Sequence, residues 1–173
     1  WKTIMPTIKF DRKIFFFYSI LVVLIFFVDR ISKIYVINYT KEIFDISIYN
    51  SKFLNITLIW NEGIAFGLFS QGNEFFYNIL TALIVIISIG VLFFSVKYKG
   101  LKRCALLFIF GGSLGNLYDR ISYSAVPDFI DFHINEFHWF VFNVADIFIS
   151  IGVIIMIMTE FFVKNKNQND QNN

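Results

Sequence analysis

Four apolar stretches, each long enough or nearly long enough to cross a lipid bilayer, constrain this chain more than any other feature of its sequence. A helix that crosses the hydrocarbon core needs about 20 consecutive, mostly apolar residues. The stretches are residues 14–36, 75–96, 101–117 and 139–163. The third contains the G-x-x-x-G pair Gly111 and Gly115, which favours close helix packing. We therefore expect a mainly α-helical membrane protein with four transmembrane helices, forming a single domain over residues 1–163.

The composition agrees with a membrane environment. Of the 173 residues, 57% are hydrophobic and only 16% are charged, and the mean hydropathy is +0.63. An average soluble domain is about 25% charged. The formal net charge is only +2, which gives no support to a nucleic-acid partner. The last residues, 164–173, are polar and low in complexity, so we expect a disordered tail.

Basic residues predict the orientation of the helices. Lysine and arginine gather before the first stretch, between the second and third, and after the fourth, whereas segments 38–74 and 119–138 carry few. Because basic segments remain in the cytoplasm, both termini are expected there and both long connections outside. Within the first connection, KFLNITLIWN has the β-branched and aromatic residues of a strand. We expect it to form part of a small outer sheet.

Costly polar side chains lie near the predicted outer ends of these helices. An ionisable group inside a bilayer costs roughly 2.5–3.5 kcal/mol on insertion scales and marks function by default. A fourth helix starting at Trp139 would place Asp146 roughly 10 Å below the outer surface. The groups that converge at this level are Asp29, Arg30, Lys33, Asn116, Asp119, Arg120, Asp128, Asp131, Asn143 and Asp146. Their convergence predicts one site.

Two neighbouring carboxyl groups could supply the chemistry of that site. One cysteine and two histidines, without an HExxH or CxxC pattern, provide no evident metal-ligand set, so we expect no metal and no other cofactor. Two close aspartates can share a proton, because burial and like charge keep one protonated while the other is ionised. The ionised one can activate water while the protonated one polarises a peptide carbonyl. From the residues alone, the partner of Asp146 could be Asp128, Asp119, Asp131 or Asp29.

Five short motifs follow one another between Val28 and Asp146. They read VDRISK, NEGIAF, GNLYDR, VPDFI and FNVAD. With these motifs in this order, the chain resembles the lipoprotein signal peptidases, also called signal peptidase II. Family members often have valine where this chain has Pro127, which fixes φ and removes a backbone donor but deletes no needed side chain.

The resemblance implies an intramembrane aspartic endopeptidase of the bacterial cytoplasmic (inner) membrane, with its site near the outer face. It would remove the signal peptide from a prolipoprotein just before a diacylglyceryl-modified cysteine, acting as a monomer among membrane lipids. The resemblance makes Asp128 and Asp146 the catalytic pair. It assigns substrate binding to Asn61, Asn116, Arg120, Asn143, Asp29 and Lys33, and structural-motif roles to Gly63, Phe66 and Asp119.

Two other functions are compatible with buried carboxylates. An ion or proton transporter needs polar groups through the full membrane depth and often has inverted repeats. Here the inner half holds only Glu160, and the sequence shows no repeat. A non-enzymatic scaffold subunit would need no aspartate pair and would tolerate its loss. The sequence therefore favours the peptidase.

Overall fold

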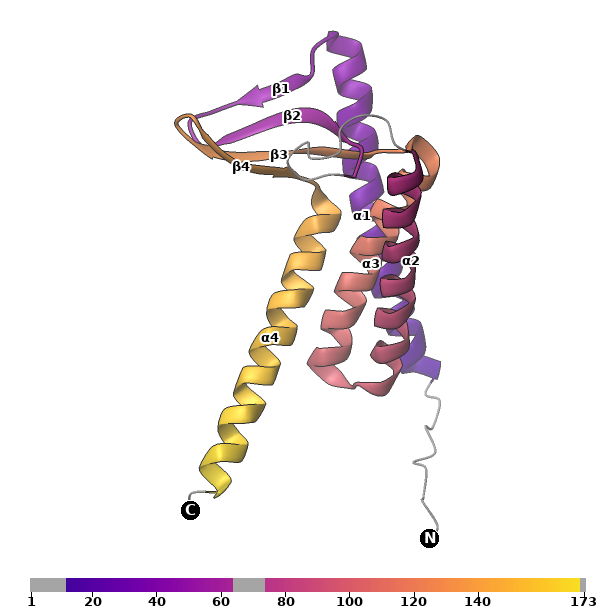
Figure 1. The fold of residues 1–173 in the computed structure, drawn as a ribbon, viewed down its shortest axis with the longest axis vertical. Coiled ribbons are helices and arrows are strands. Elements are labelled where there is room, and N and C mark those ends of the chain that lie inside the picture. Colours follow the sequence, from indigo (N-terminus) through magenta and orange to yellow (C-terminus); the bar gives the residue numbers. More distant parts are fainter. Residues whose placement is uncertain (1–11, 64–73, 172–173) are drawn as a thin grey trace.

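A computed structural model describes residues 12–63 and 74–171 of the chain (Figure 1). Phe66, one of the predicted motif residues, lies outside these ranges. The helices are α1 (Arg12–Ile43), α2 (Glu74–Lys97), α3 (Gly100–Tyr123) and α4 (Val144–Gln171), and the strands are β1 (Ser47–Asn50), β2 (Leu54–Asn61), β3 (Val126–Ile134) and β4 (Phe137–Phe142). Figure 1 shows the sheet at one end of the helices, away from the α2–α3 turn and from the C-terminal end of α4.

Three of the described helices, α1, α2 and α4, are long and apolar enough to cross a membrane. Their large side chains face outward, as with Ile86 and Phe161, which are 66% and 60% exposed. A helix that is apolar on all sides is suited to lipid rather than water. α3 contacts the three other helices and carries glycines and polar groups. The expected mainly helical membrane protein with a small antiparallel sheet is confirmed.

The start of the fourth helix was predicted wrongly. Trp139 to Phe142 belong to strand β4, and α4 begins only at Val144. The apolar run continues from the strand into the helix, so hydropathy alone cannot separate them. Backbone pairing with β3 selects the strand conformation for this segment. Asp146 therefore lies in the first turn of α4 and not about two turns inside it.

Other helix boundaries also differ from the prediction. α1 continues to Ile43, beyond residue 36, and α3 continues to Tyr123, so that Asp119 and Arg120 are helical. α4 extends to Gln171 and includes most of segment 164–173, for which we expected disorder. Adding a residue to a formed helix costs far less than nucleating one, so polar residues can prolong a helix beyond its apolar part.

The sheet has the order β1-β2-β3-β4, and every neighbouring pair is antiparallel. The predicted strand in KFLNITLIWN is confirmed as β2, whereas β3 was expected only as part of an outer connection, and residues 139–142 of β4 as the start of the fourth helix. A buried cluster of Val36 and Ile37 from α1 with Leu58 and Phe129 from the sheet fixes the sheet to α1. This cluster positions β3 above the helices.

Small residues allow α3 to pack closely against its neighbours. A Cβ atom at Gly112 would lie 2.5 Å from the carbonyl oxygen of Ala145, and one at Gly152 would lie 2.6 Å from that of Ala105. The predicted G-x-x-x-G pair packs on α1, since a Cβ at Gly111 would meet Ile25 and one at Gly115 would overlap the Asp29 carboxylate. Close backbone approach of this kind is typical of membrane helices.

Substituting Gly112 with alanine should therefore destabilise the protein. The added methyl group would force α3 and α4 apart, and overpacking of this kind costs about 1–3 kcal/mol. Gly90→Ala is the matched control, because a Cβ there meets nothing within 4 Å. Thermal unfolding in detergent should show a lower midpoint for Gly112→Ala and an unchanged or higher midpoint for Gly90→Ala. Equal midpoints would contradict the close α3–α4 contact.

Candidate active site

Asn143 joins two carboxyl groups, those of Asp128 on β3 and Asp146 on α4. Its side-chain amide donates a hydrogen bond of 2.6 Å to Asp128 Oδ1. Its backbone N–H donates to Asp146 Oδ2 at 3.1 Å, and its Oδ1 accepts the backbone N–H of Asp146 at 3.2 Å. Asn143 itself is fully buried. One residue thus fixes both carboxyl groups, although they come from different elements.

The start of α4 explains this geometry. Asn143 precedes the first helical residue and Asp146 is the third, so their two reciprocal bonds form a capping box. Ala145, the second residue of the helix, has a backbone N–H without an acceptor inside the helix, and this N–H donates to Asp29 Oδ1 at 2.9 Å. An anionic side chain is also favoured by the positive end of the helix dipole. The same residues therefore start the helix and place Asp146.

Asp128 is held from the sheet. Its Oδ2 accepts a 2.9 Å bond from Asn61 Nδ2, and Asn61 is itself fixed because its Oδ1 accepts the backbone N–H of Gly63. Asp128 is only 4% exposed. Burial raises the pKa of Asp128 to about 6, and the nearby charge of Asp146 acts in the same direction, against the lowering effect of its amide hydrogen bonds and of Lys33. This carboxyl therefore retains a proton at a higher pH than an ordinary aspartate.

Asp146 is held from α3. Its Oδ1 accepts a 2.8 Å bond from Asn116 Nδ2. The other end of that amide, Asn116 Oδ1, accepts a bond of 2.7 Å from the Lys33 ammonium. The amide orientation is thereby determined at both ends, which keeps its N–H group directed at Asp146.

Lys33 is the centre of a fully buried ion cluster. Its ammonium donates to Asp29 Oδ2 at 2.9 Å and to Asp119 Oδ2 at 2.7 Å, in addition to Asn116. All three of its donors are therefore used. Arg30 adds a second cation, 2.6 Å from Asp119 Oδ1 and with its guanidinium above the Tyr118 ring. Two cations and two carboxylates balance, so the cluster is formally neutral.

Arg120 and Gly63 lie beside this cluster. Gly63 has a φ of +104°, and a Cβ there would lie 2.9 Å from Arg120 Nη1. The guanidinium lies over the Tyr77 ring at 5.5 Å, and the Tyr77 hydroxyl donates to the Arg120 carbonyl. Within residues 12–63 and 74–171, Arg120 Nε and Nη1 are buried without a hydrogen-bond partner. No hydrogen bond or ion pair between Arg120 and Asp128 or Asp146 is present among the described contacts.

The structure brings together most of the predicted site residues. Asp29, Lys33, Asn61, Asn116, Asp119, Asp128, Asn143 and Asp146 form one continuous network of hydrogen bonds and ion pairs. Sequence reasoning assigned no site role to Arg30, although Arg30 adjoins Asp29 and is one of the charged residues of an apolar helix. It did not include Tyr77, which nothing in the sequence singles out.

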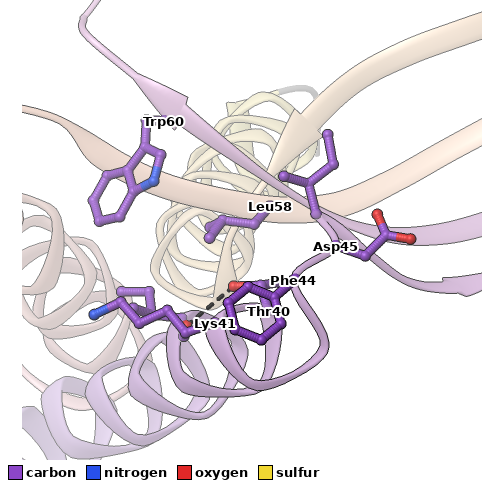
Figure 2. Close-up of a pocket in the computed structure, with 8 residues that line it drawn as sticks. Thr40, Lys41, Phe44, Asp45, Leu58 and Trp60 are labelled. Carbon is purple, nitrogen blue, oxygen red and sulfur yellow. Dashed lines mark hydrogen bonds between the residues drawn. The ribbon is translucent and has the colours of Figure 1, made fainter.

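A pocket elsewhere holds none of these groups. It has a volume of about 250 Å³ and lies between the C-terminal end of α1 and the sheet. Figure 2 shows Leu58 and Trp60 of β2 on one side of it and Thr40 and Lys41 of α1 on the other. Thr40 donates back to main-chain carbonyls of its own helix. Neither Asp128 nor Asp146 lines this pocket, so the aspartate pair remains the candidate active site.

Comparison with known proteins assigns the family. Residues 21–162 match the family model described as signal peptidase (SPase) II. The chain belongs to the signal peptidase II family. The lipoprotein signal peptidase of Pelagibacter ubique is 46% identical over 164 residues, which cover 95% of this chain and 99% of the relative. That of Aquifex aeolicus is 37% identical over 158 residues, covering 90% and 92%.

Solved structures agree with this membership of the signal peptidase II family. A structure described as a bacterial membrane enzyme has a TM-score of 0.71 and 33% identity, and the match covers 86% of this chain and 90% of that one. A second of the same description has a TM-score of 0.67 and 35% identity. The protein is therefore a peptidase of a bacterial membrane, and the transporter and scaffold alternatives are not favoured.

Removing the buried ammonium should severely destabilise the protein. Lys33→Met would leave Asp29 and Asp119 short of positive charge, and breaking a buried ion pair in this way costs about 3–5 kcal/mol. Lys102→Met is the matched control, because Lys102 pairs with Glu160 where both side chains are partly exposed. Such pairs contribute up to about 1 kcal/mol. Unfolding in detergent should separate the two variants, and a stable Lys33→Met protein would contradict the cluster.

Asp128→Asn should become increasingly stabilising, relative to the wild type, as the pH rises. The pKa of Asp128 is raised from 3.8 to about 6 in the folded protein, so between these values the unfolded chain releases the proton first. Wild-type stability then falls with rising pH, by up to about 3 kcal/mol in total. Asparagine does not titrate. Unfolding midpoints of both proteins from pH 4 to pH 8 should diverge, and a constant difference would refute the raised pKa.

Proposed function

We propose that Asp128 and Asp146 are the catalytic pair of an aspartic endopeptidase that cleaves prolipoproteins just before the lipid-modified cysteine. The single observation that carries the proposal is the bonding of Asn143 to both carboxyl groups. Asparagine in this position can hold two acids within reach of one substrate bond. The substrate class follows from the names of the relatives, which are lipoprotein signal peptidases.

The surroundings of the two acids differ and favour different roles. Asp128 retains a proton to a higher pH because it is buried. Both carboxyl groups accept two N–H donors, but only Asp146 lies in the first turn of a helix, where the positive end of the helix dipole favours its anion. Asp146 would take a proton from water, whose oxygen attacks the peptide carbonyl carbon, while Asp128 gives its proton to the carbonyl oxygen. The proton taken up by Asp146 then passes to the amide nitrogen. The C–N bond breaks, and a hydroxyl group on the former carbonyl carbon returns its proton to Asp128.

The neutral ion cluster supports a single shared proton. Because Lys33 and Arg30 are matched by Asp29 and Asp119, the cluster itself offers no net positive charge to balance two further carboxylates. Ionising both members of the Asp128–Asp146 pair would place two like charges in a buried site, which is strongly unfavourable. The pair is therefore suited to carry one proton and one charge.

We place the site near the outer face of the bacterial inner membrane. All four helices would cross, with both ends of the chain in the cytoplasm and the sheet outside. Basic residues support this orientation, since they gather in the α2–α3 turn, at the end opposite the sheet (Figure 1). The scissile bond of a substrate helix in the same membrane would then meet Asp146 at the level where α4 begins. One domain, residues 1–163, would act as a monomer in contact with lipids.

Neighbouring residues would bind the substrate backbone. The Nε and Nη1 groups of Arg120, which have no hydrogen-bond partner among residues 12–63 and 74–171, are suited to peptide or ester carbonyl oxygens. Asn61, Asn116 and Asn143 would orient the acids beside the substrate, and Asp29 and Lys33 would hold Asn116 and the start of α4 in place. Gly63, Phe66 and Asp119 would have structural-motif roles, that of Asp119 through Lys33 and Arg30.

Asp128→Asn and Asp146→Asn should each abolish cleavage. Loss of a general acid or base lowers the rate by about 100-fold to 10,000-fold. The assay would use purified full-length protein and a peptide bearing the lipid-modified cysteine. Asp45→Asn is the control, since it removes an exposed carboxylate that accepts a hydrogen bond from the main chain of Ser47 and, among the described residues, bonds to none of the site residues. Both test variants should remain folded, because asparagine has nearly the shape of aspartate and keeps one of the two hydrogen bonds that each carboxyl group accepts. A wild-type rate in either one would refute the pair.

A further inference from the structure

A second group of chemically active side chains lies on the β3–β4 hairpin, outside the aspartate pair. It consists of Asp131, His133 and His138. Asp131 and His133 alternate along β3, so both face the same side of the sheet, and His138 is the residue of β4 directly opposite His133. One ligand atom from each of the three lies within 4.8 Å of the others. None of the three bonds to Asp128 or Asp146 among the described contacts.

The contacts within this group are those of a partly assembled binding site. His138 Nδ1 lies 2.8 Å from Asp131 Oδ2, which also accepts a 3.3 Å bond from Asn55. The imidazole rings of His133 and His138 stack with their centres 5.0 Å apart. His133 Nδ1 is buried and, within the described part of the chain, has no hydrogen-bond partner. An unsatisfied buried nitrogen is costly, and a bound cation would satisfy it.

The donor set selects the kind of cation. Two imidazoles and one carboxylate suit zinc, whereas calcium and magnesium prefer oxygen ligands alone. Ligand atoms around a tetrahedral zinc, each about 2.0–2.2 Å from the metal, lie roughly 3.3 Å apart. The Asp131–His138 distance is already this short, and the histidine rings would have to unstack by a small rotation. The His138 side chain is 54% exposed, so it is free to rotate.

We propose that Asp131, His133 and His138 bind a zinc ion on the outer hairpin, with water completing the coordination. The sequence spacing D-x-H-x₄-H gave no such indication, because the ligands converge only through the hairpin register. A zinc ion there would link β3 to β4. These strands carry Asp128 and lead directly into Asn143, so the ion would stabilise the framework of the aspartate pair without taking part in its chemistry.

Zinc titration of the purified, tag-free full-length protein tests this proposal. Calorimetry with zinc chloride should show one saturable site per chain. His133→Gln and His138→Gln should weaken binding by at least about tenfold, because even second-shell changes cost 10–100-fold in metal affinity. Glu136→Gln is the matched control, since it removes an exposed carboxylate from the turn of the same hairpin. It should bind zinc as the wild type does.

Two further readouts give independent outcomes. Zinc should raise the thermal unfolding midpoint of the wild type and of Glu136→Gln, but not that of His138→Gln, whose exposed side chain can be replaced without unfolding the hairpin. Cobalt substitution should give the visible absorption of a tetrahedral site in the wild type and in Glu136→Gln, but not in His138→Gln. Absence of saturable zinc binding, or binding unchanged in both histidine variants, would overturn the proposal. Neither result depends on cleavage activity.

Discussion

The buried ammonium of Lys33 is the interaction on which the site depends. It is surrounded by acceptors from two helices, Asp29 on its own helix and Asn116 and Asp119 on α3. Removing a charge from water costs several kcal/mol unless every donor is matched, so this arrangement tolerates little variation in how α1 and α3 pack. The same contacts reach α4 twice, because Asn116 bonds to Asp146 and Asp29 bonds to the backbone of Ala145. The position of Asp146 is thus determined by three helices.

Asp128 is positioned by the sheet and not by the Lys33 cluster. It belongs to the sheet, which is fixed to α1 by apolar contacts and carries Asn61 on the neighbouring strand. Helices and sheet meet at Asn143, the residue between the end of β4 and the start of α4. Its side chain holds Asp128 while its backbone holds Asp146. A small displacement of Asn143 would therefore change the separation of the two carboxyl groups more than a displacement elsewhere in the sheet or the helices.

Hydropathy and charge patterns predicted the helices and the convergence of the polar groups into one network, because a bilayer requires apolar helices of a certain length and makes polar groups within them costly. They could not locate the start of α4, since the apolar residues of β4 merge with those of the helix. Asn143 and Asp146 contain the missing signal, as their three-residue spacing is that of a capping box. The β3–β4 hairpin was missed because residues 139–142 of β4 were assigned to that helix. Asp128 was one of four possible partners until the motifs singled it out, and the structure links it to Asn143.

The central claim is that Asp128 and Asp146 share one proton during catalysis. The pH dependence of kcat/KM for a lipid-modified peptide tests it most directly. The account predicts a bell-shaped profile whose alkaline limb has an apparent pKa near 6 or somewhat above it, because Asp128 loses its proton there. A profile that rises to a plateau and shows no alkaline limb would mean that no protonated carboxyl is required, which would contradict the account.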